Sequence, residues 1–234
     1  MSRPVPDLVL LHVWRVPRRG VAPALRRVAA DRTAVRRTPG VRFAKVLGTG
    51  TGRTFGPRDA DLTRWALLTC WSDRAAARRF DDGPLVGAWR RACREAWRAE
   101  LRPVAARGRW SGVEPFGQPA GGRDGGPVVA LTRARLTTRR TARFWSAVPP
   151  VSGALHRSPG LLAALGVGEA PVGLQGTVSL WRDDAALRGF AYGSDVHRAV
   201  VDRTPGEGWY AEELFARFAV EASAGTLDGR DPLA

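Results

Sequence analysis

The chain begins the same pattern twice, as LVLLHVWRV at residues 8–16 and as VVALTRARL at residues 128–136. Both segments are rich in apolar and β-branched residues, and this composition predicts a buried strand at the start of each half. The features that follow recur in the same order: a helix that stops at Pro-Gly, a strand that runs into glycines, and a strand that ends in tryptophan before a helix cap. The sequence therefore predicts a tandem duplication.

The two halves can be aligned along most of their length. The matched features are Pro39-Gly40 with Pro159-Gly160, residues 47–50 with 165–168, Trp71 with Trp181, Glu100 with Glu213, and Gly108-x-x-x-Gly112 with Gly225-x-x-x-Gly229. In this alignment Gly87 occupies the position of His197. Such a difference is expected if only the second half binds a ligand, although duplicated halves also diverge neutrally.

Each half is predicted to be a β-α-β-β-α-β unit of the ferredoxin-like kind, with a four-stranded antiparallel sheet and helices on one face. The other face of the sheet must also be covered, and two sheets packed face to face cover each other. We therefore predict an α+β fold, a dimeric-α/β-barrel-like domain made from one chain. The expected division is 1–116 for the first repeat, 117–127 for a Gly/Pro-rich linker and 128–234 for the second repeat, with a helix at 85–98 and a strand at 101–107.

The formal net charge of +15 raises the question of nucleic-acid or membrane binding. Lys45 is the only lysine, and the arginines are scattered among alanines rather than gathered into a dense stripe. No aromatic-rich RNA-binding motif accompanies them, so nucleic-acid binding is not expected. A positive face that docks an acidic redox partner is compatible with the charge.

The sequence also indicates the cellular compartment and the state of the two cysteines. There is no run of about 18 apolar residues, and the first apolar segment is too short for a signal peptide, so we expect a cytoplasmic protein. Cys70 and Cys93 lie in no metal-binding or disulfide pattern and are predicted to be reduced, buried thiols.

His197 is the candidate metal ligand. It lies one turn into a predicted helix that begins at 193–195, with valines at 196, 200 and 201 as the apolar positions. A neutral imidazole that points into an apolar cavity is a suitable axial ligand for a haem iron or another metal. The alternative is a hydrogen-bonded core or surface histidine, and the helix by itself does not decide between the two.

Polar residues mark the third strand of the second half. Where the first half has Trp65, Leu67 and Thr69 on one face, the second half has Gln175, Thr177 and Ser179. A buried face that has become polar has something to hydrogen-bond, unless it is solvated at an edge. Arg133 and Arg135 could hold a bound oxygen species or a propionate, or could be exposed or paired with carboxylates. Residues for a pocket wall, or for the core, are Phe144, Trp145, Tyr192, Trp209 and Phe215.

Longer stretches connect the chain with a known family. They include TRWALLTCWSD at 63–73, RFWSAVPPVSG at 143–153, GVGEAPVGLQGTVSLW at 166–181, FAYGSDVHRAVV at 190–201 and GTLDGRDP at 225–232. In these stretches, and more so in the second half, the chain resembles the spheroidene monooxygenase family.

The resemblance implies a haem b-containing oxygenase. It implies that a hydrophobic small molecule, a carotenoid or another secondary metabolite, is oxidised with O₂ and electrons from an external donor such as ferredoxin. His197 falls in the segment that matches the family's haem ligand, and a homodimer is one expected assembly. In this interpretation Arg133 is the distal catalytic residue, and the cofactor-binding residues besides His197 are Gln175, Thr177, Ser179, Tyr192 and Trp209.

Other interpretations stay open. One is a cofactor-free oxygenase of the same fold, and a second is a haem enzyme of natural-product biosynthesis with dehydratase or nitrogen-centred chemistry. A third is a haem carrier without enzymatic activity. Ligation of iron by Cys70 or Cys93 is less favoured, because neither lies in a recognisable haem-thiolate loop.

Overall fold

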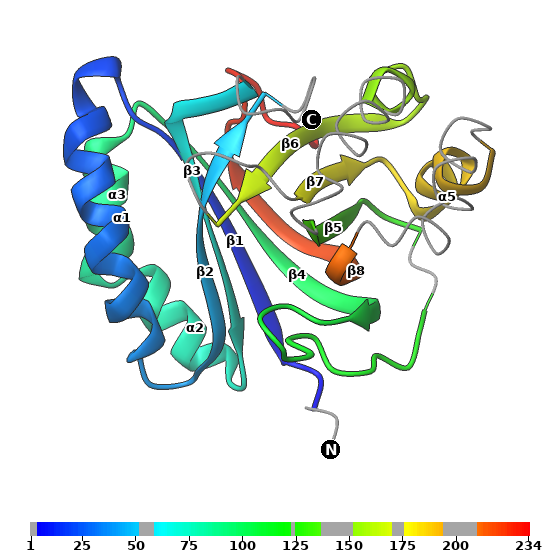
Figure 1. Ribbon diagram of the computed structural model, residues 1–234, viewed down its shortest axis with the longest axis horizontal. Helices are drawn as coiled ribbons and strands as arrows, with labels where there is room; N and C mark the ends of the chain where they lie inside the picture. The colour runs from blue at the N-terminus through cyan, green and yellow to red at the C-terminus, as the bar shows by residue number, and fades with distance from the viewer. Residues whose placement is uncertain (1–3, 52–58, 123–124, 137–151, 170–175, 194–209) are drawn as a thin grey trace.

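The structure, a computed structural model, describes residues 4–51, 59–122, 125–136, 152–169, 176–193 and 210–234. Eight antiparallel strands close into a barrel, with helices on two opposite sides (Figure 1). The strands are β1 (Leu8–Arg15), β2 (Val41–Gly50), β3 (Ala60–Trp71), β4 (Glu95–Gly108), β5 (Val128–Leu136), β6 (Leu161–Gly168), β7 (Gly176–Trp181) and β8 (Tyr210–Gly225). The helices are the short 3-10 helix η1 (Arg18–Gly20), α1 (Val21–Arg36), α2 (Arg74–Asp81), α3 (Pro84–Ala92) and α5 (Asp184–Gly193), and residues 152–156 are also helical.

The two halves of the chain contribute equivalent parts of the barrel. Around the barrel the strands follow the order β1-β3-β2-β6-β7-β5-β8-β4. The first half therefore supplies β4-β1-β3-β2 and the second half β8-β5-β7-β6, each in the strand order of a ferredoxin-like unit. Among the described residues no helix is long and apolar enough to span a membrane.

The half-sheets join at two seams of unequal length. β4 and β8 are aligned over eleven residue pairs, whereas β2 and β6 share only three, between residues 48–50 and 166–168. The two sheets that were expected to pack face to face are thus one continuous wall. The expected α+β architecture with an antiparallel barrel is confirmed. Descent from a duplicated unit stays a prediction, and so do the domain limits 1–116, 117–127 and 128–234.

The barrel interior is an apolar core shared by both halves. Alternate residues of each strand point inward, as the pleat requires, and Val9, Leu47, Val129 and Leu165 are among those that meet there. The turn after β4 and the turn after β8 add Trp110 and Leu227 to the same core. The interior is thus a packed core, as in other small barrels.

Each of these two turns begins at a glycine whose replacement by any other residue would strain the backbone. Gly108 and Gly225 have φ angles of 89° and 90°, in the left-handed region that other residues rarely adopt. A Cβ atom on Gly108 would lie 2.2 Å from the carbonyl oxygen of Glu213, and one on Gly225 would lie 2.1 Å from that of Ala96. The matched glycines of the sequence alignment thus have matched geometry.

Bulky side chains fill the outer face of the first half. The Trp14 ring stacks on the Trp89 ring of α3 with the centroids 5.0 Å apart, and the His12 ring also stacks on Trp14 with the centroids 5.1 Å apart. Asp31 of α1 accepts a 2.7 Å hydrogen bond from the Trp89 indole. In Figure 1 the helices α1, α2 and α3 form one layer over this face, and α5 lies on the opposite side of the barrel.

Two element boundaries differ from the sequence prediction. The expected helix at 85–98 ends at Ala92, and the strand expected at 101–107 begins at Glu95, because residues 97, 99 and 101 alternate into the barrel.

The strand register also corrects two details of the sequence alignment. Leu10 pairs with Glu100 and Ala130 with Arg217, so Arg217, not Glu213, is the counterpart of Glu100. In the same way Gly168 rather than Gly166 is the counterpart of Gly48.

Replacement of Trp14 by alanine should lower the free energy of unfolding by about 3–5 kcal/mol, because it leaves a cavity between His12 and Trp89. Denaturant unfolding followed by circular dichroism measures the loss. Leu62→Ala is the control, since Leu62 is 44% exposed and its truncation should change stability by less than about 0.5 kcal/mol. Similar losses in both variants would show that the tryptophan stack does not anchor α3.

Candidate functional site

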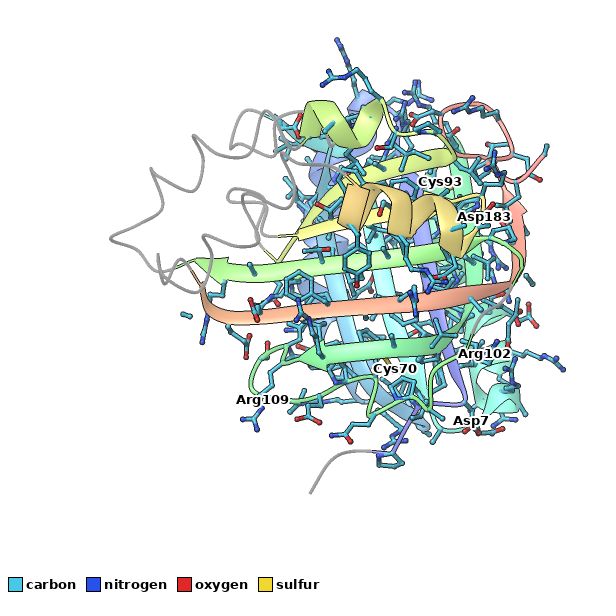
Figure 2. The ribbon with its side chains drawn as sticks, turned by 90° about the vertical axis from the view of Figure 1, so that its right-hand side faces the viewer. Asp7, Cys70, Cys93, Arg102, Arg109 and Asp183 are labelled. Carbon is cyan, nitrogen blue, oxygen red and sulfur yellow. The ribbon has the colours of Figure 1, made fainter. Side chains whose placement is uncertain are left out.

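The outer face of the second half carries the candidate site, and strand alternation defines which residues lie on it. Val129 and Leu131 of β5 belong to the interior core, so Ala130, Thr132 and Ala134 lie on the outer face. On β7, Val178 and Leu180 point inward, which places 177 and 179 on the outer face. Figure 2 looks onto this side of the barrel, with α5 lying across the strands.

The register allows a position-by-position comparison of the two outer faces. In the first half Val46, Leu67 and His12 are neighbours on adjacent strands. The same three positions of the second half hold Gly166, Thr177 and Thr132. At the next position along the opening strand, Trp14 is replaced by Ala134. We call the set Gly166, Thr177, Thr132, Ala130 and Ala134 the outer floor.

The comparison shows that side-chain volume is missing from the outer floor. In the first half His12 and Trp14 are each only 1% exposed, because Trp89 of α3 stacks on Trp14 and Asp81 of α2 contacts His12. In the second half Thr132 is exposed, whereas Ala134 is 7% exposed. Protein interiors are close-packed. The second half has smaller residues where the first half has a tryptophan, a histidine and a leucine, so its outer face can be buried to the same extent only if other atoms lie on it. A flat group that lies on the sheet meets this requirement.

His12 shows how the first half closes the equivalent position with its own side chains. Its Nε2 atom lies 2.8 Å from a carboxylate oxygen of Asp81, which also pairs with Arg98 at 2.7 Å and Arg90 at 2.8 Å. Burial lowers the pKa of His12, and Asp81 offsets this only in part. The imidazole is therefore a packed residue that fills its position on the first-half face with its own side chain.

The structure places only some of the predicted cofactor-binding residues. Thr177 is half-buried on the outer floor. Ser179 lies on the same face, but it is 6% exposed and accepts a 2.9 Å hydrogen bond from the Trp181 indole, as Thr69 does from Trp71 at 2.8 Å. These bonds give Ser179 a structural role.

Tyr192 is the third described candidate, and it is not buried. It lies in the last turn of α5 and is 71% exposed. His197, Gln175 and Trp209 lie outside the described residues, so their predicted roles stay predictions.

Arg133, the predicted distal residue, points into the barrel and not toward the outer floor. It is 4% exposed, forms an ion pair with Glu212, and its guanidinium lies 5.7 Å from the centre of the Trp110 ring. Thr132, the neighbour of Arg133 in the strand, lies on the opposite face. This placement gives no support to a contact between Arg133 and a group on the outer floor. The paired arginine, which was the alternative, is what the structure shows.

Arg133 belongs to a buried charge network at one end of the barrel. Lys45 lies 3.1 Å from Glu169 and donates a 2.7 Å hydrogen bond to Ser111, while Arg133 lies 3.5 Å from Glu169. Sequence reasoning missed this network, because its members come from β2, β5, the end of β6, β8 and a turn. The one available signal was Lys45, the only lysine, inside an otherwise apolar strand.

The network keeps its two carboxylates ionised. Burial would raise the pKa of Glu212, but the backbone N–H groups of Gly112 and Ser111 and the charge of Arg133 lower it below its ordinary value. Burial would likewise raise the pKa of Glu169, but the hydrogen bond from the Trp110 indole and the charge of Lys45 lower it below its ordinary value. The inward charges are thus compensated, as buried charges must be.

Neither cysteine is placed to act as a thiolate ligand on the outer floor. Cys70 belongs to the barrel interior and is fully buried (Figure 2). Cys93 follows α3 on the first half, and burial raises the pKa of its thiol. Within the described residues there is no cluster of three or more His, Cys, Asp and Glu side chains that could hold a metal ion.

Comparison with known proteins identifies related sequences. No protein-family profile matches the chain. The chain is 38% identical over 199 residues to the spheroidene monooxygenase of Rhodobacter capsulatus, covering 84% of this chain and 82% of the relative. It is also 38% identical over 217 residues to the spheroidene monooxygenase of Rubrivivax gelatinosus, covering 90% and 82%. The enzyme of that name from Cereibacter sphaeroides is 33% identical over 211 residues, with 89% and 65% covered.

Two solved structures with a similar fold are aldoxime dehydratases. A crystal structure of aldoxime dehydratase superposes with a TM-score of 0.62 at 12% identity, covering 96% of this chain and 86% of that one. The aldoxime dehydratase OxdRE in complex with butyraldoxime gives a TM-score of 0.61 at 9% identity, covering 94% and 82%. At such identities the likeness concerns the fold alone.

The charge network should make the stability of the barrel depend on acid. Because the pKa values of Glu169 and Glu212 are lowered in the folded state, their contribution is complete above the ordinary value of 4.5 and is lost as the pH falls through the lower folded-state values. Unfolding free energies measured by denaturant at a series of pH values should therefore fall on acidification from about pH 5, and Glu212→Gln should show a shallower fall.

Glu213→Gln is the matched control for this experiment. It removes the neighbouring carboxylate on the opposite face of β8, which makes no ion pair with any described residue, and should keep the wild-type pH dependence. Equal pH dependence in the wild type and in Glu212→Gln would contradict the assignment.

Proposed function

Because the chain belongs to the spheroidene monooxygenase family, we propose that it is a haem-dependent monooxygenase that oxidises a hydrophobic small molecule. The haem, a haem b, would lie on the outer floor of the second half. The reaction would use O₂ and electrons from an external donor such as ferredoxin. The oxygen chemistry would come from the haem iron when the group is bound.

One observation carries the proposal: the outer floor lacks the bulk that closes the equivalent face of the first half. Val46, Leu67, His12 and Trp14 become Gly166, Thr177, Thr132 and Ala134 at register-matched positions. A flat macrocycle needs a floor without protruding side chains, and glycine, alanine and threonine provide one. The residues present therefore fit the group.

His197 is proposed as the axial ligand of the iron. Support comes from the sequence alignment, in which its counterpart is Gly87. Gly87 lies on α3, the helix whose Trp89 covers Trp14 in the first half. A ligand from the equivalent segment of the second half would approach the outer floor from the side opposite the sheet. Gln175 and Trp209 stay proposals of the same kind.

The chain itself would provide binding, orientation and exclusion of water. Thr132 and Thr177 are paired across β5 and β7 and lie on the same face of the sheet, and neither hydroxyl has a side-chain hydrogen bond to another described residue. They are free to donate to a polar atom above the sheet. The apolar floor around them would shield the reacting group from bulk water.

The substrate class and the partners follow from the relatives. The named relatives are spheroidene monooxygenases, so a carotenoid is the proposed substrate class, with other hydrophobic secondary metabolites as the wider class. An acidic electron donor would be attracted by the net charge of +15. A homodimer in the cytoplasm stays part of the proposal.

We also propose that the fold arose by tandem duplication. The equal strand order of the halves, the matched glycine turns and the repeated tryptophan-to-hydroxyl bonds at Thr69 and Ser179 support this origin. The second half would have lost bulk on its outer face when it acquired the cofactor.

Titration of the purified protein with hemin, followed in the ultraviolet-visible spectrum, tests the proposal. The wild type should show a saturable Soret band, and His197→Ala should shift or lose it. Thr132→Trp should weaken hemin binding by at least tenfold, about 1.4 kcal/mol, because it restores bulk on the outer floor. With O₂, a reductant and an acyclic carotenoid, the wild type should give an oxygenated product.

Ala222→Trp is the matched control, since it adds the same side chain at an exposed position of β8 and should leave the titration unchanged. Denaturant unfolding checks that both tryptophan variants are folded. A wild type without a Soret band, or equal hemin affinities of Thr132→Trp and wild type, would contradict the proposed site.

A further inference from the structure

The outer floor continues across two more strands and ends at a cation. Thr132 pairs with Phe215 of β8, and Phe215 pairs with Arg107 of β4. Directly paired residues point to the same side of a sheet, so a single row runs across the outer face. It consists of Gly166, Thr177, Thr132, Phe215 and Arg107.

Arg107 differs from the other arginines on the outer face of β4 and β8. It is exposed, its guanidinium lies 4.5 Å from the centre of the Phe215 ring, and it forms no ion pair with any described residue. The other three each have a carboxylate: Arg98 pairs with Asp81 at 2.7 Å, Arg102 with Glu221 at 3.3 Å and Arg217 with Asp184 at 2.7 Å.

The corresponding row of the first half has no such cation at its end. It runs through Val46, Leu67, His12, Arg98 and Ala224. Ala224 therefore stands where the second half has Arg107, and Arg98 stands where it has Phe215. The arginine appears only beside the face that lacks bulk, and this face is the proposed binding face.

The geometry suits an anionic substituent on a flat ligand. Adjacent strands are 4.7–4.9 Å apart, so the backbone of Arg107 lies about 10 Å from that of Thr132 across the row. The aromatic ring holds the guanidinium by a cation–π contact and leaves its N–H edge free. A guanidinium in this state can bind a carboxylate with two parallel hydrogen bonds.

We infer that Arg107 binds a carboxylate of the group on the outer floor, namely a propionate of the haem. The inference rests on the proposed function, because that function puts the haem on this face. Phe215 is the residue that positions Arg107. The first half, through β4, thus supplies one binding residue to a site on the second half.

The test compares hemin with iron protoporphyrin IX dimethyl ester, in which both propionates are blocked. Soret titrations give a dissociation constant of each porphyrin for wild type and for Arg107→Gln. Loss of a charge-assisted pair should weaken hemin binding by roughly 10- to 100-fold, and the affinity for the dimethyl ester should stay the same. Arg107→Lys keeps the positive charge but lacks the planar guanidinium, so its hemin affinity should lie between those of the wild type and Arg107→Gln.

Arg109→Gln is the matched control. Arg109 lies two residues further along, beyond the end of β4 (Figure 2), and its side chain is 65% exposed. This variant should bind both porphyrins as the wild type does. Equal weakening by Arg107→Gln and Arg109→Gln would show a general effect of charge, and would overturn the assignment of Arg107.

The outcomes separate the two proposals. If the wild type binds both porphyrins and Arg107→Gln binds hemin equally well, the inference on Arg107 is wrong and the haem site stands. If Arg107→Gln weakens both porphyrins alike, Arg107 does not recognise the carboxylate. If the wild type binds neither porphyrin, the proposed function fails and the role of Arg107 fails with it.

Discussion

Closure of eight strands around one apolar interior is the constraint on which the rest of this structure depends. Residues from both halves meet in that interior, and Trp110 and Leu227 extend it into the turns beyond β4 and β8. A substitution that changed the inward volume of one half would therefore disturb the other half as well. The outward faces share no such common core, because their buried apolar residues form separate clusters. Differences between the halves are thus expected on the outside of the barrel, and the register shows them there.

The four differences on the outer faces all reduce side-chain volume in the second half, and packing alone does not explain this. In the first half the outer face is filled by the protein's own side chains: Trp14 stacks on Trp89 and so packs α3 against the sheet. At matched positions the second half has Ala134 and Thr132. Neutral drift in a covered face exchanges one bulky apolar residue for another, because a cavity costs about 24 cal/mol per Å³. Loss of bulk at four adjacent positions is what a ligand that occupies the same volume would permit.

Sequence reasoning could predict the fold because the signals of the fold are periodic. Alternation on the third strands assigned Trp65, Leu67, Thr69 and Trp71 to one face, and the structure confirms this assignment. It misjudged the last strand of the first half, where Glu95 to Arg98 resemble the end of a helix, since local propensity does not include the pairing of Trp97 with Val13.

The site was harder to predict than the fold. Arg133 was assigned to the ligand for its chemistry, although the alternation of Val129 and Leu131 shows that it points inward. The charge network could not be predicted, because its members come from separate elements.

That network explains why a barrel with charged groups inside it can still be stable. Lys45 and Arg133 lie within 4 Å of Glu169, and Glu212 accepts hydrogen bonds from the backbone of Ser111 at 2.9 Å and Gly112 at 2.6 Å. Each charge therefore has a fixed partner, which is the condition for tolerating it below the surface. The network ties the end of β5 and the start of β8 to β2 and to the residue after β6. It fixes the start of β8, the strand that follows the segment containing His197, so the interior would hold the frame while the outer face would hold the ligand.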